Sequence, residues 1–380
     1  MPKHADLKPS TVTAQAMGAC DPTTKAIIPP LIASTPYERS PDGSYPGGHS
    51  YTRDQNPTYK PCENLLAHLE KGYEALLFSS GMTAAVTVFE NLPFGAHVVI
   101  PEYMYWTLRL WLEKMSSKGR FVIDSSPNGD LDGLRRVIRP GVTKLVWVET
   151  PSNPTCAITD ISGTVEVAHQ AGARVVVDGT IATPVLSRPL ELGADMVMHS
   201  ATKQLNGHSD VLAGVLITAC DDAAWASIKQ DRSVRGAVVG PFEAWLLLRG
   251  LRTLFLRVTK ASDTAQQIAE MLVALPNVTE VFYPGLALHP GHDVALRQMH
   301  GGFGPIVSFC VDGYNEASRV VQSLRVFRNA TSLGGVESLV EHRAQVEGLQ
   351  TNIPKDLIRL SVGIEDVDDL ATDLKQSLTS

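Results

Sequence analysis

Short apolar runs alternate with amphipathic stretches over the first two thirds of the chain. The apolar runs are rich in β-branched residues and are bounded by Gly, Pro or Asp, which is typical of strands. Stretches such as Thr107–Lys114 and Ser162–Gln170 have helical spacing instead. This alternation predicts an α/β fold with a mostly parallel sheet and helices on both faces. The predicted strands are Ala75–Phe78, His97–Ile100, Arg120–Ile123, Lys144–Val148, Ala173–Val177, Met196–Met198 and Val211–Ile217.

The two ends of the chain have different patterns. The first 60 residues are rich in Pro, Gly, Ser and Thr and show little periodicity, which predicts an extended arm. Pro241–Lys260 has helical spacing and is predicted to form one long helix. From Ala261 we expect a smaller α+β domain with a fresh helix, strands near Val278–Val281 and Ile306–Phe309, and a last helix over Val367–Leu378. The predicted parts are therefore an arm (1–60), a large domain (61–250) and a C-terminal domain (251–380).

Composition removes several classes of function. The chain has 380 residues, of which 44% are hydrophobic and 19% charged, as in ordinary globular proteins. Its net charge of −7, without a long run of one sign, argues against a nucleic-acid binder. No apolar stretch of about 18 residues occurs, so no membrane span is predicted, and the N-terminus has no signal-peptide pattern. The five scattered cysteines form no CxxC pair, and we expect free thiols in a reducing cytoplasm.

Candidate chemistry gathers where the predicted strands end. Asp178 closes one strand, and the cluster Ser200-Ala-Thr202-Lys203 follows a later one. Ligands in open α/β sheets bind outside the carboxyl ends of the strands, so these residues are expected at one edge of the sheet. Ser79-Ser80-Gly81-Met82 is a small-residue turn between a strand and a helix, and the free N–H groups of such a turn suit an anion.

These residue types meet the needs of an aldehyde cofactor held as a Schiff base. Such a cofactor needs a lysine amine of lowered pKa, a carboxylate at its pyridine nitrogen and small hydroxyls for its phosphate. Taken alone, each residue has an ordinary explanation, such as a solvated lysine or an N-cap aspartate. His199 and His208 suggest a metal, but no ligand set accompanies them, and we expect none.

Several longer motifs occur in order along almost the whole chain, and together they carry a family resemblance. The sequence resembles the cystathionine γ-synthase, cystathionine γ-lyase and methionine γ-lyase family of pyridoxal-phosphate enzymes. One such motif would be weak support, whereas this many in the same order is strong. Besides the Asp178 and Lys203 motifs they are Tyr51-Thr-Arg53-Asp-Gln-Asn56-Pro-Thr58, Ser80-Gly-Met82, Glu149-Thr-Pro-Ser-Asn153-Pro154, Pro241 to Thr253, Ser332 to Leu339 and Arg359 to Glu365.

The resemblance implies pyridoxal 5′-phosphate as the cofactor and an aspartate-aminotransferase-like fold with a seven-stranded sheet. It implies that Lys203 is the Schiff-base lysine and a catalytic residue, that Asp178 pairs with the pyridinium nitrogen, and that Asn153 bonds the ring hydroxyl. Tyr51 and Arg53 would reach the phosphate from a neighbouring subunit, so the arm would contact that subunit in a homotetramer. The other implied cofactor residues are Ser80, Gly81, Met82, Thr180, Ser200 and Thr202.

The same resemblance places the substrate toward the C-terminal domain. Arg359 would grip the α-carboxylate with its guanidinium fork, and Ser332 and Glu337 would line the substrate pocket. Tyr105 would stack on the cofactor ring and act in proton transfer, with Tyr103 as the alternative position. Arg109 lies one helical turn beyond Tyr105 and is a further candidate for a pocket charge.

The chain departs from the family pattern at several positions near the expected substrate. Trp106 stands where a small residue is usual, Gly179 replaces the Asn of Asp-Asn-Thr, and Ser50 stands where some lyases have an acid. Arg343 replaces the Pro of His-Pro-Ala, and Gln345–Gly348 stands where a Met-Thr-His element is usual. These changes leave the substrate and the reaction subtype open, but not the cofactor.

The predicted function is that of a lyase or transferase acting on an L-amino acid with a γ leaving group, of the sulfur-amino-acid or homoserine-derivative type. A β-lyase that releases pyruvate and an O-acylhomoserine sulfhydrylase remain alternatives. The set Lys203, Asp178 and Arg359 argues against a silent binding protein. A nicotinamide dehydrogenase is disfavoured because no GxGxxG turn follows an early strand. Cystathionine, methionine, O-acyl-homoserines and canavanine-like amino acids all remain open as substrates.

Overall fold

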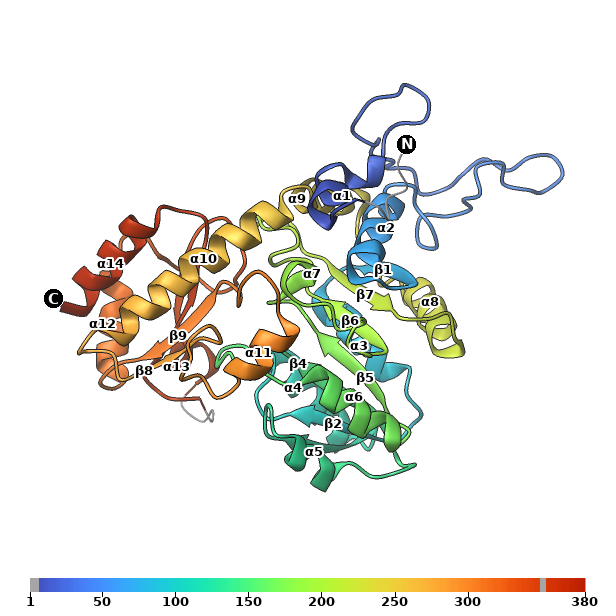
Figure 1. Ribbon diagram of the computed structural model, residues 1–380. Helices are drawn as coiled ribbons and strands as arrows, with labels where there is room; N and C mark the ends of the chain where they lie inside the picture. Colours follow the sequence, from blue (N-terminus) through green and yellow to red (C-terminus); the bar gives the residue numbers. More distant parts are fainter. Residues whose placement is uncertain (1–6, 349–352, 380) are drawn as a thin grey trace.

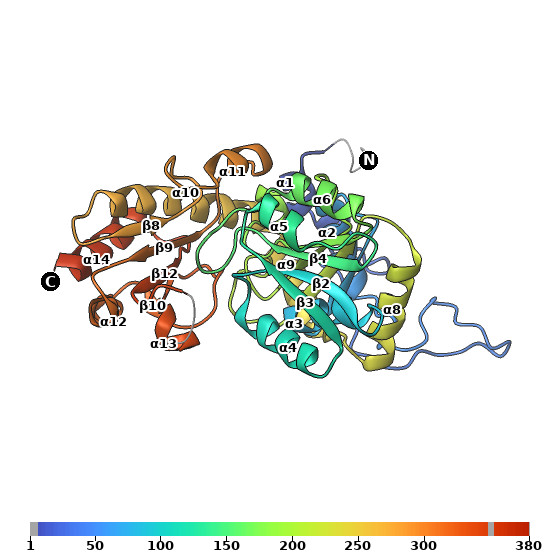
Figure 2. The same ribbon diagram turned by 90° about the horizontal axis from the view of Figure 1, so that it is seen from below.

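The computed structural model describes residues 7–348 and 353–379 and has two lobes (Figure 1). A seven-stranded sheet lies in the larger lobe, and a five-stranded sheet lies in the smaller one. Turned by 90°, the molecule shows the two lobes side by side (Figure 2). The described residues before Tyr59 form a short helix, α1 (Pro9–Ala14), and one 3-10 turn (Ala16–Gly18), and two long loops of this arm project from the larger lobe.

The larger sheet has the strand order β1-β7-β6-β5-β4-β2-β3. Strand β7 runs antiparallel to both of its neighbours, and the other pairs are parallel. The predicted α/β class with a mostly parallel, seven-stranded sheet is therefore confirmed. The strands are β1 (Glu74–Phe78), β2 (Ala96–Pro101), β3 (Phe121–Ser126), β4 (Thr143–Glu149), β5 (Arg174–Asp178), β6 (Met196–His199) and β7 (Gly214–Thr218).

Helices cover both faces of this sheet because successive strand residues point to opposite sides. One face packs Val98, Trp147 and Val176 against α3 (Gly81–Glu90), α4 (Trp106–Ser117) and α8 (Ala223–Arg235). The other face packs residues such as Val175 and Ile217 against a second set of helices. That set comprises α2 (Tyr59–Glu70), α5 (Leu131–Val137), α6 (Ile161–Gln170), α7 (Thr183–Leu186) and α9 (Pro241–Leu251).

The smaller lobe is an α+β unit in which α10 (Leu254–Val273), α12 (Tyr314–Ser323) and α14 (Val367–Thr379) share one apolar core with the sheet. Its strand order is β10-β11-β12-β9-β8, in which only the short β10–β11 pair is parallel. The remaining elements are β8 (Glu280–Phe282), β9 (Ile306–Cys310), β10 (Arg328–Asn329), β11 (Leu339–His342), β12 (Leu357–Ser361), α11 (His292–Gln298) and α13 (Arg343–Glu347).

One predicted element is wrong, and two predicted strands are present with shifted bounds. The single helix over 241–260 is two helices, because the chain leaves helical geometry at Thr253 (φ −110°, ψ 9°) before α10 begins, and α10 then continues past Ala261. The strand predicted from Val211 begins at Gly214, because Ala213 instead bonds the Thr202 hydroxyl. The strand near 278–281 is shifted to Glu280–Phe282.

One buried arginine of α10 holds the turn that carries Lys203. The Arg257 guanidinium donates to the carbonyls of Gln204 (2.8 Å), Leu205 (3.3 Å) and Gly250 (2.8 Å), and burial lowers its pKa to about 10. Gly207 has φ +73°, and a Cβ there would lie 1.7 Å from Arg257 Nη1, so this position requires glycine. The contact fixes the turn after β6 to the helix that runs from the larger lobe into the smaller one.

We expect Arg257→Met to lower the free energy of unfolding by about 3 kcal/mol, because buried carbonyls lose their donors at about 1–3 kcal/mol each. Urea unfolding followed by circular dichroism measures the change. Arg249→Met, at an exposed position of α9, is the matched control and should stay within about 0.5 kcal/mol of the parent. Equal stability of the two variants would contradict the anchoring role of Arg257.

Candidate active site

A cavity of about 370 Å³ opens at the carboxyl ends of β4, β5 and β6, where loops of the smaller lobe meet the larger sheet. It brings together residues that lie more than 270 positions apart in the sequence, from Ser80 to Arg359. Twelve of the site residues predicted from the sequence line it: Ser80, Gly81, Met82, Tyr105, Asn153, Asp178, Thr180, Ser200, Thr202, Lys203, Ser332 and Arg359.

Lys203 lies in the turn after β6 and points its amine across to the smaller lobe. Its Nζ donates to the Ser332 hydroxyl at 2.7 Å. Burial lowers the pKa of the amine, and the nearby Arg359 charge lowers it further, while Glu341 acts in the opposite direction. Ser332 has φ +97°, a strained conformation for a non-glycine residue, and strain of this kind clusters at functional sites. A lysine of lowered pKa carries more of the neutral, nucleophilic amine at a given pH.

Asp178 ends β5 and is buried beside the turn that carries Lys203. Burial raises the pKa of its carboxyl, and the N–H of Thr180, which donates to Asp178 Oδ1 at 3.0 Å, acts against this. The Thr180 hydroxyl in turn accepts from the N–H of Ser200 at 2.8 Å, so the ends of β5 and β6 are joined. A buried carboxylate of this kind is stabilised by a cationic partner such as a protonated ring nitrogen.

The N-terminus of α3 forms the wall that suits a phosphate. Ser80 caps the helix by accepting from the N–H of Thr83 at 3.0 Å, and Gly81 and Met82, whose N–H groups have no partner within the first helical turn, line the cavity. A Cβ on Gly81 would lie 2.8 Å from Ser200 Cβ, so only glycine lets α3 approach the Ser200–Thr202 turn this closely. Backbone N–H groups beside two hydroxyls are a donor set that fits a phosphate.

Arg359 presents its guanidinium from β12. It donates to Asn153 Oδ1 (3.1 Å) and to the Ser332 carbonyl (2.6 Å), and it forms an ion pair with Glu341. This side chain is almost fully buried, and its fork geometry suits a carboxylate. The site thus offers a group for each part of pyridoxal phosphate and an amino acid. Lys203 suits the aldehyde, Asp178 the ring nitrogen, the N-terminus of α3 the phosphate, and Arg359 the carboxylate of the amino acid.

Tyr105, rather than Tyr103, lines the cavity. Tyr105 is 44% exposed at the start of α4, whereas Tyr103 packs near Cys310 and bonds Asn128 through its backbone. Glu149 at the end of β4 accepts from the N–H groups of Tyr105 (2.6 Å) and Asn153 (2.8 Å). The sequence analysis gave no role to Glu149, although its position at the end of a predicted strand indicated that it lies near the site.

The structure does not bring four of the predicted residues into this cavity. Arg109 Nη2 instead donates to the carbonyls of Pro101 (2.5 Å) and Glu102 (2.7 Å), because its helix leads the side chain back to the end of β2. Glu337 turns toward the Ser209 hydroxyl, from which it accepts a hydrogen bond. Neither residue is among those that line the cavity, and their substrate-binding roles stay predictions. Tyr51 and Arg53 also lie outside, exposed on the arm, with the guanidinium 5.1 Å from the ring centroid.

Other lining residues escaped the sequence analysis. Glu341 and Thr331 line the cavity, as do Trp106, Arg343 and Val346, which had been noted only as departures from the family pattern. Among the described residues no group of three or more His, Cys, Asp and Glu side chains is placed to hold a metal ion. None of the described helices is long and apolar enough to cross a membrane.

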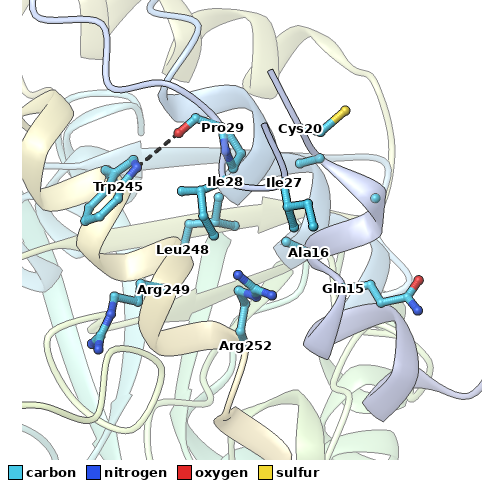
Figure 3. A pocket seen from close by; sticks show the side chains of 12 residues that line it. Gln15, Ala16, Cys20, Ile27, Ile28, Pro29, Trp245, Leu248, Arg249 and Arg252 are labelled. Atoms are coloured by element: carbon cyan, nitrogen blue, oxygen red, sulfur yellow. Dashed lines mark hydrogen bonds between the residues drawn. The ribbon is translucent and has the colours of Figure 1, made fainter. Parts of the chain in front are cut away.

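A second cavity, of about 530 Å³, lies between the arm and α9 (Figure 3). The Trp245 indole donates to the Pro29 carbonyl at its edge (3.1 Å), and Ile27, Ile28 and Leu248 line it. Its described lining lacks the combination of buried lysine, acid and phosphate cradle that the first cavity has. We therefore assign the chemistry to the cavity around Lys203.

Comparison with known proteins agrees with this geometry. A family model described as "Cys/Met metabolism PLP-dependent enzyme" matches residues 10–379. Cystathionine gamma-synthase of Mycobacterium tuberculosis is 43% identical over 97% of this chain and 96% of its own length. Cystathionine gamma-lyase of Saccharomyces cerevisiae is 41% identical over 93% of both chains.

Solved structures give the same result. Cystathionine gamma synthase of Xanthomonas oryzae pv. oryzae, in complex with cystathionine, has a TM-score of 0.93 at 36% identity and 98% coverage of both chains. The apo form of a methionine gamma lyase from Micromonospora echinospora has a TM-score of 0.91 at 38% identity, covering 99% of this chain and 100% of that one. The predicted fold, cofactor and enzyme class are confirmed, and the chain belongs to the Cys/Met metabolism family of pyridoxal-phosphate-dependent enzymes.

Proposed function

We propose that the cavity around Lys203 catalyses γ-elimination or γ-replacement on an L-amino acid that carries a heteroatom leaving group at Cγ. The observation that carries this proposal is the convergence of the Lys203 amine, the Arg359 guanidinium and the Tyr105 ring on one cavity. When bound, pyridoxal phosphate supplies a protonated ring that draws electron density from the substrate Cα. The division into arm (1–60), cofactor domain (61–250) and substrate-side domain (251–380) is part of the proposal.

The residues of the cavity take separate tasks in this proposal. Arg359 binds the substrate α-carboxylate, and Asn153, which accepts from Arg359, bonds the ring hydroxyl of the cofactor. Asp178 keeps the ring nitrogen protonated. Lys203 Nζ removes the proton from Cα and then moves protons between Cα, Cβ and the departing group, and the Tyr105 hydroxyl assists the first transfer. The Ser332 hydroxyl, which accepts from Lys203 Nζ, orients the lysine toward the substrate side of the cavity.

A panel of β- and γ-substituted amino acids tests the reaction class. We expect a four-carbon product, such as 2-oxobutyrate or a thiol adduct, from at least one γ-substituted amino acid, identified by mass spectrometry of the released carbon skeleton. The leaving group of that amino acid then names the substrate. Pyruvate alone, without any four-carbon product, would overturn the proposal in favour of β-elimination.

β-Elimination is the second candidate, and Trp106 is the observation that favours it. The indole lines the cavity beside Tyr105, where bulk reduces the room for a long side chain. Relatives named cystathionine beta-lyase, from Coxiella burnetii and Lactococcus lactis, are 38% and 40% identical to the chain.

We expect Gly81→Ala to weaken the binding of pyridoxal phosphate by at least about tenfold, because the added Cβ separates α3 from the Ser200 turn. Titration of the apo-protein with the cofactor, followed by absorbance, measures the affinity. Gly47→Ala is the matched control, because a Cβ at Gly47 meets nothing within 4 Å. Unchanged affinity in Gly81→Ala would show that the N-terminus of α3 does not form the phosphate site.

We further propose that the enzyme is a cytoplasmic homotetramer whose active sites are shared within dimers. The exposed positions of Tyr51 and Arg53 on the projecting arm support sharing, and the five free cysteines support a reducing compartment. In this arrangement the arm of one subunit brings Arg53 to the phosphate of the next.

Subunit mixing tests the shared site. Lys203→Ala should lose more than about a thousandfold in turnover, since the proton shuttle is removed, and Arg53→Ala should be strongly impaired. Mixed after subunit exchange, the two variants should recover up to about a quarter of parental activity, because one site of each hybrid dimer is intact. Lys114→Ala, an exposed lysine of α4, serves as the unaffected control. Absence of recovery would show that Arg53 acts within its own chain.

A further inference from the structure

Arg343 brings a second guanidinium into the cavity beside Arg359. It is the first residue of α13, directly after β11, and its side chain is 8% exposed. Its Nη1 donates to Glu341 Oε2 at 2.6 Å, and the same carboxylate oxygen is paired with Arg359 Nη2. One buried carboxylate therefore bridges two buried arginines in the wall of the substrate cavity.

The pairing of Glu341 with Arg359 is a consequence of strand register. These two residues are directly opposite each other in the antiparallel β11–β12 ladder. Side chains of such a pair lie within reach on the same face of the sheet. The backbone thus holds a fixed carboxylate against the guanidinium that the proposed function assigns to the substrate.

This geometry creates a conflict when an amino acid binds. Its α-carboxylate has to approach Arg359 while the Glu341 carboxylate lies alongside, and two like charges in a buried site repel each other. The remaining cationic group of the lining, Lys203, donates its hydrogen bond to Ser332 instead of to Glu341. Arg343 is the group placed to keep Glu341 compensated. The residue that the family usually has at this position, proline, has no donor with which to do so.

We propose that Arg343 is a positioning residue that holds the charge of Glu341 and so releases the Arg359 guanidinium for the α-carboxylate of the substrate. The inference rests on the proposed role of Arg359 and is specific to this chain's departure from the family pattern. On substrate binding, the ion pair between Arg359 and Glu341 is replaced by one between Arg359 and the substrate carboxylate. The ion pair between Arg343 and Glu341 stays in place. Arg343, Glu341 and Arg359 all keep their charges during this exchange, and the substrate adds only its own.

The test measures binding in the cofactor-loaded full-length protein. L-Norvaline carries the α-carboxylate but has no γ leaving group, and 1-butylamine is the same molecule without the carboxylate. Dissociation constants come from the change that each amine causes in the visible absorption of the cofactor. In Arg343→Met we expect the constant for L-norvaline to rise at least about tenfold, equivalent to about 1.4 kcal/mol, with that for 1-butylamine within about twofold.

A rescue variant separates charge compensation from a structural role. Glu341→Gln combined with Arg343→Met removes the charge that needs compensation and should return L-norvaline affinity to within about threefold of the parent. Arg343→Lys, which keeps the charge, should retain most of the affinity and serves as the variant of choice if Arg343→Met folds poorly. Equal losses for L-norvaline and 1-butylamine, or no rescue by Glu341→Gln, would overturn the inference.

Two further measurements distinguish the possible failures. The first uses L-2-aminoadipate, which has a second, distal carboxylate. If Arg343→Met weakens only the binding of L-2-aminoadipate, Arg343 contacts the substrate side chain and the inference is overturned. Arg359→Met tests the underlying assignment: a loss of L-norvaline affinity in this variant but none in Arg343→Met refutes only the inference. Unchanged L-norvaline affinity in Arg359→Met would refute the role of Arg359 in the proposed function.

Discussion

The parallel register of β4, β5 and β6 is the constraint on which the active site depends. Glu149 and Asp178 are direct partners across β4 and β5, and Asp178 pairs with Met198 of β6. Because all three strands end at the same edge, the residues that follow them are brought together without any contact between their side chains. The Lys203 turn follows β6 and therefore lies at the edge that already carries the two acids.

The smaller lobe completes the site through contacts that cross between the sheets. Lys203 reaches Ser332, Arg359 reaches Asn153, and the Ser308 hydroxyl donates to the Pro154 carbonyl at 2.6 Å. Helix α10 runs from one lobe into the other, and its Arg257 donates to the Gln204 carbonyl in the turn that carries Lys203. In the proposed function, substrate binding by Arg359 and proton transfer by Lys203 depend on the same fit between the lobes, because a shift of one lobe would move the two side chains apart.

The sequence was most informative where chemistry and periodicity act locally. Strand ends pointed to Asp178 and the Lys203 cluster, and turn chemistry pointed to Ser80 and Gly81, all of which line the cavity. Each of these signals is contained in a few neighbouring residues. Glu341 could not be found this way, because its role comes from the β11–β12 register across 18 positions of the chain. Arg109 has the right spacing from Tyr105, but its side chain bonds the strand end and not the cavity. The break at Thr253 is a backbone feature that apolar spacing does not record.

Burial acts on the two central ionisable groups in opposite directions. It lowers the pKa of the Lys203 amine and raises that of the Asp178 carboxyl, so both groups are moved toward their neutral forms. A ligand that places a cationic ring nitrogen against Asp178 reverses the second shift, because the charged carboxylate then gains a partner. A phosphate bound at the N-terminus of α3 would gain from the helix dipole. The folded chain would therefore gain stability from a ligand that carries both a cationic ring nitrogen and a phosphate, because such a ligand would bind the folded state.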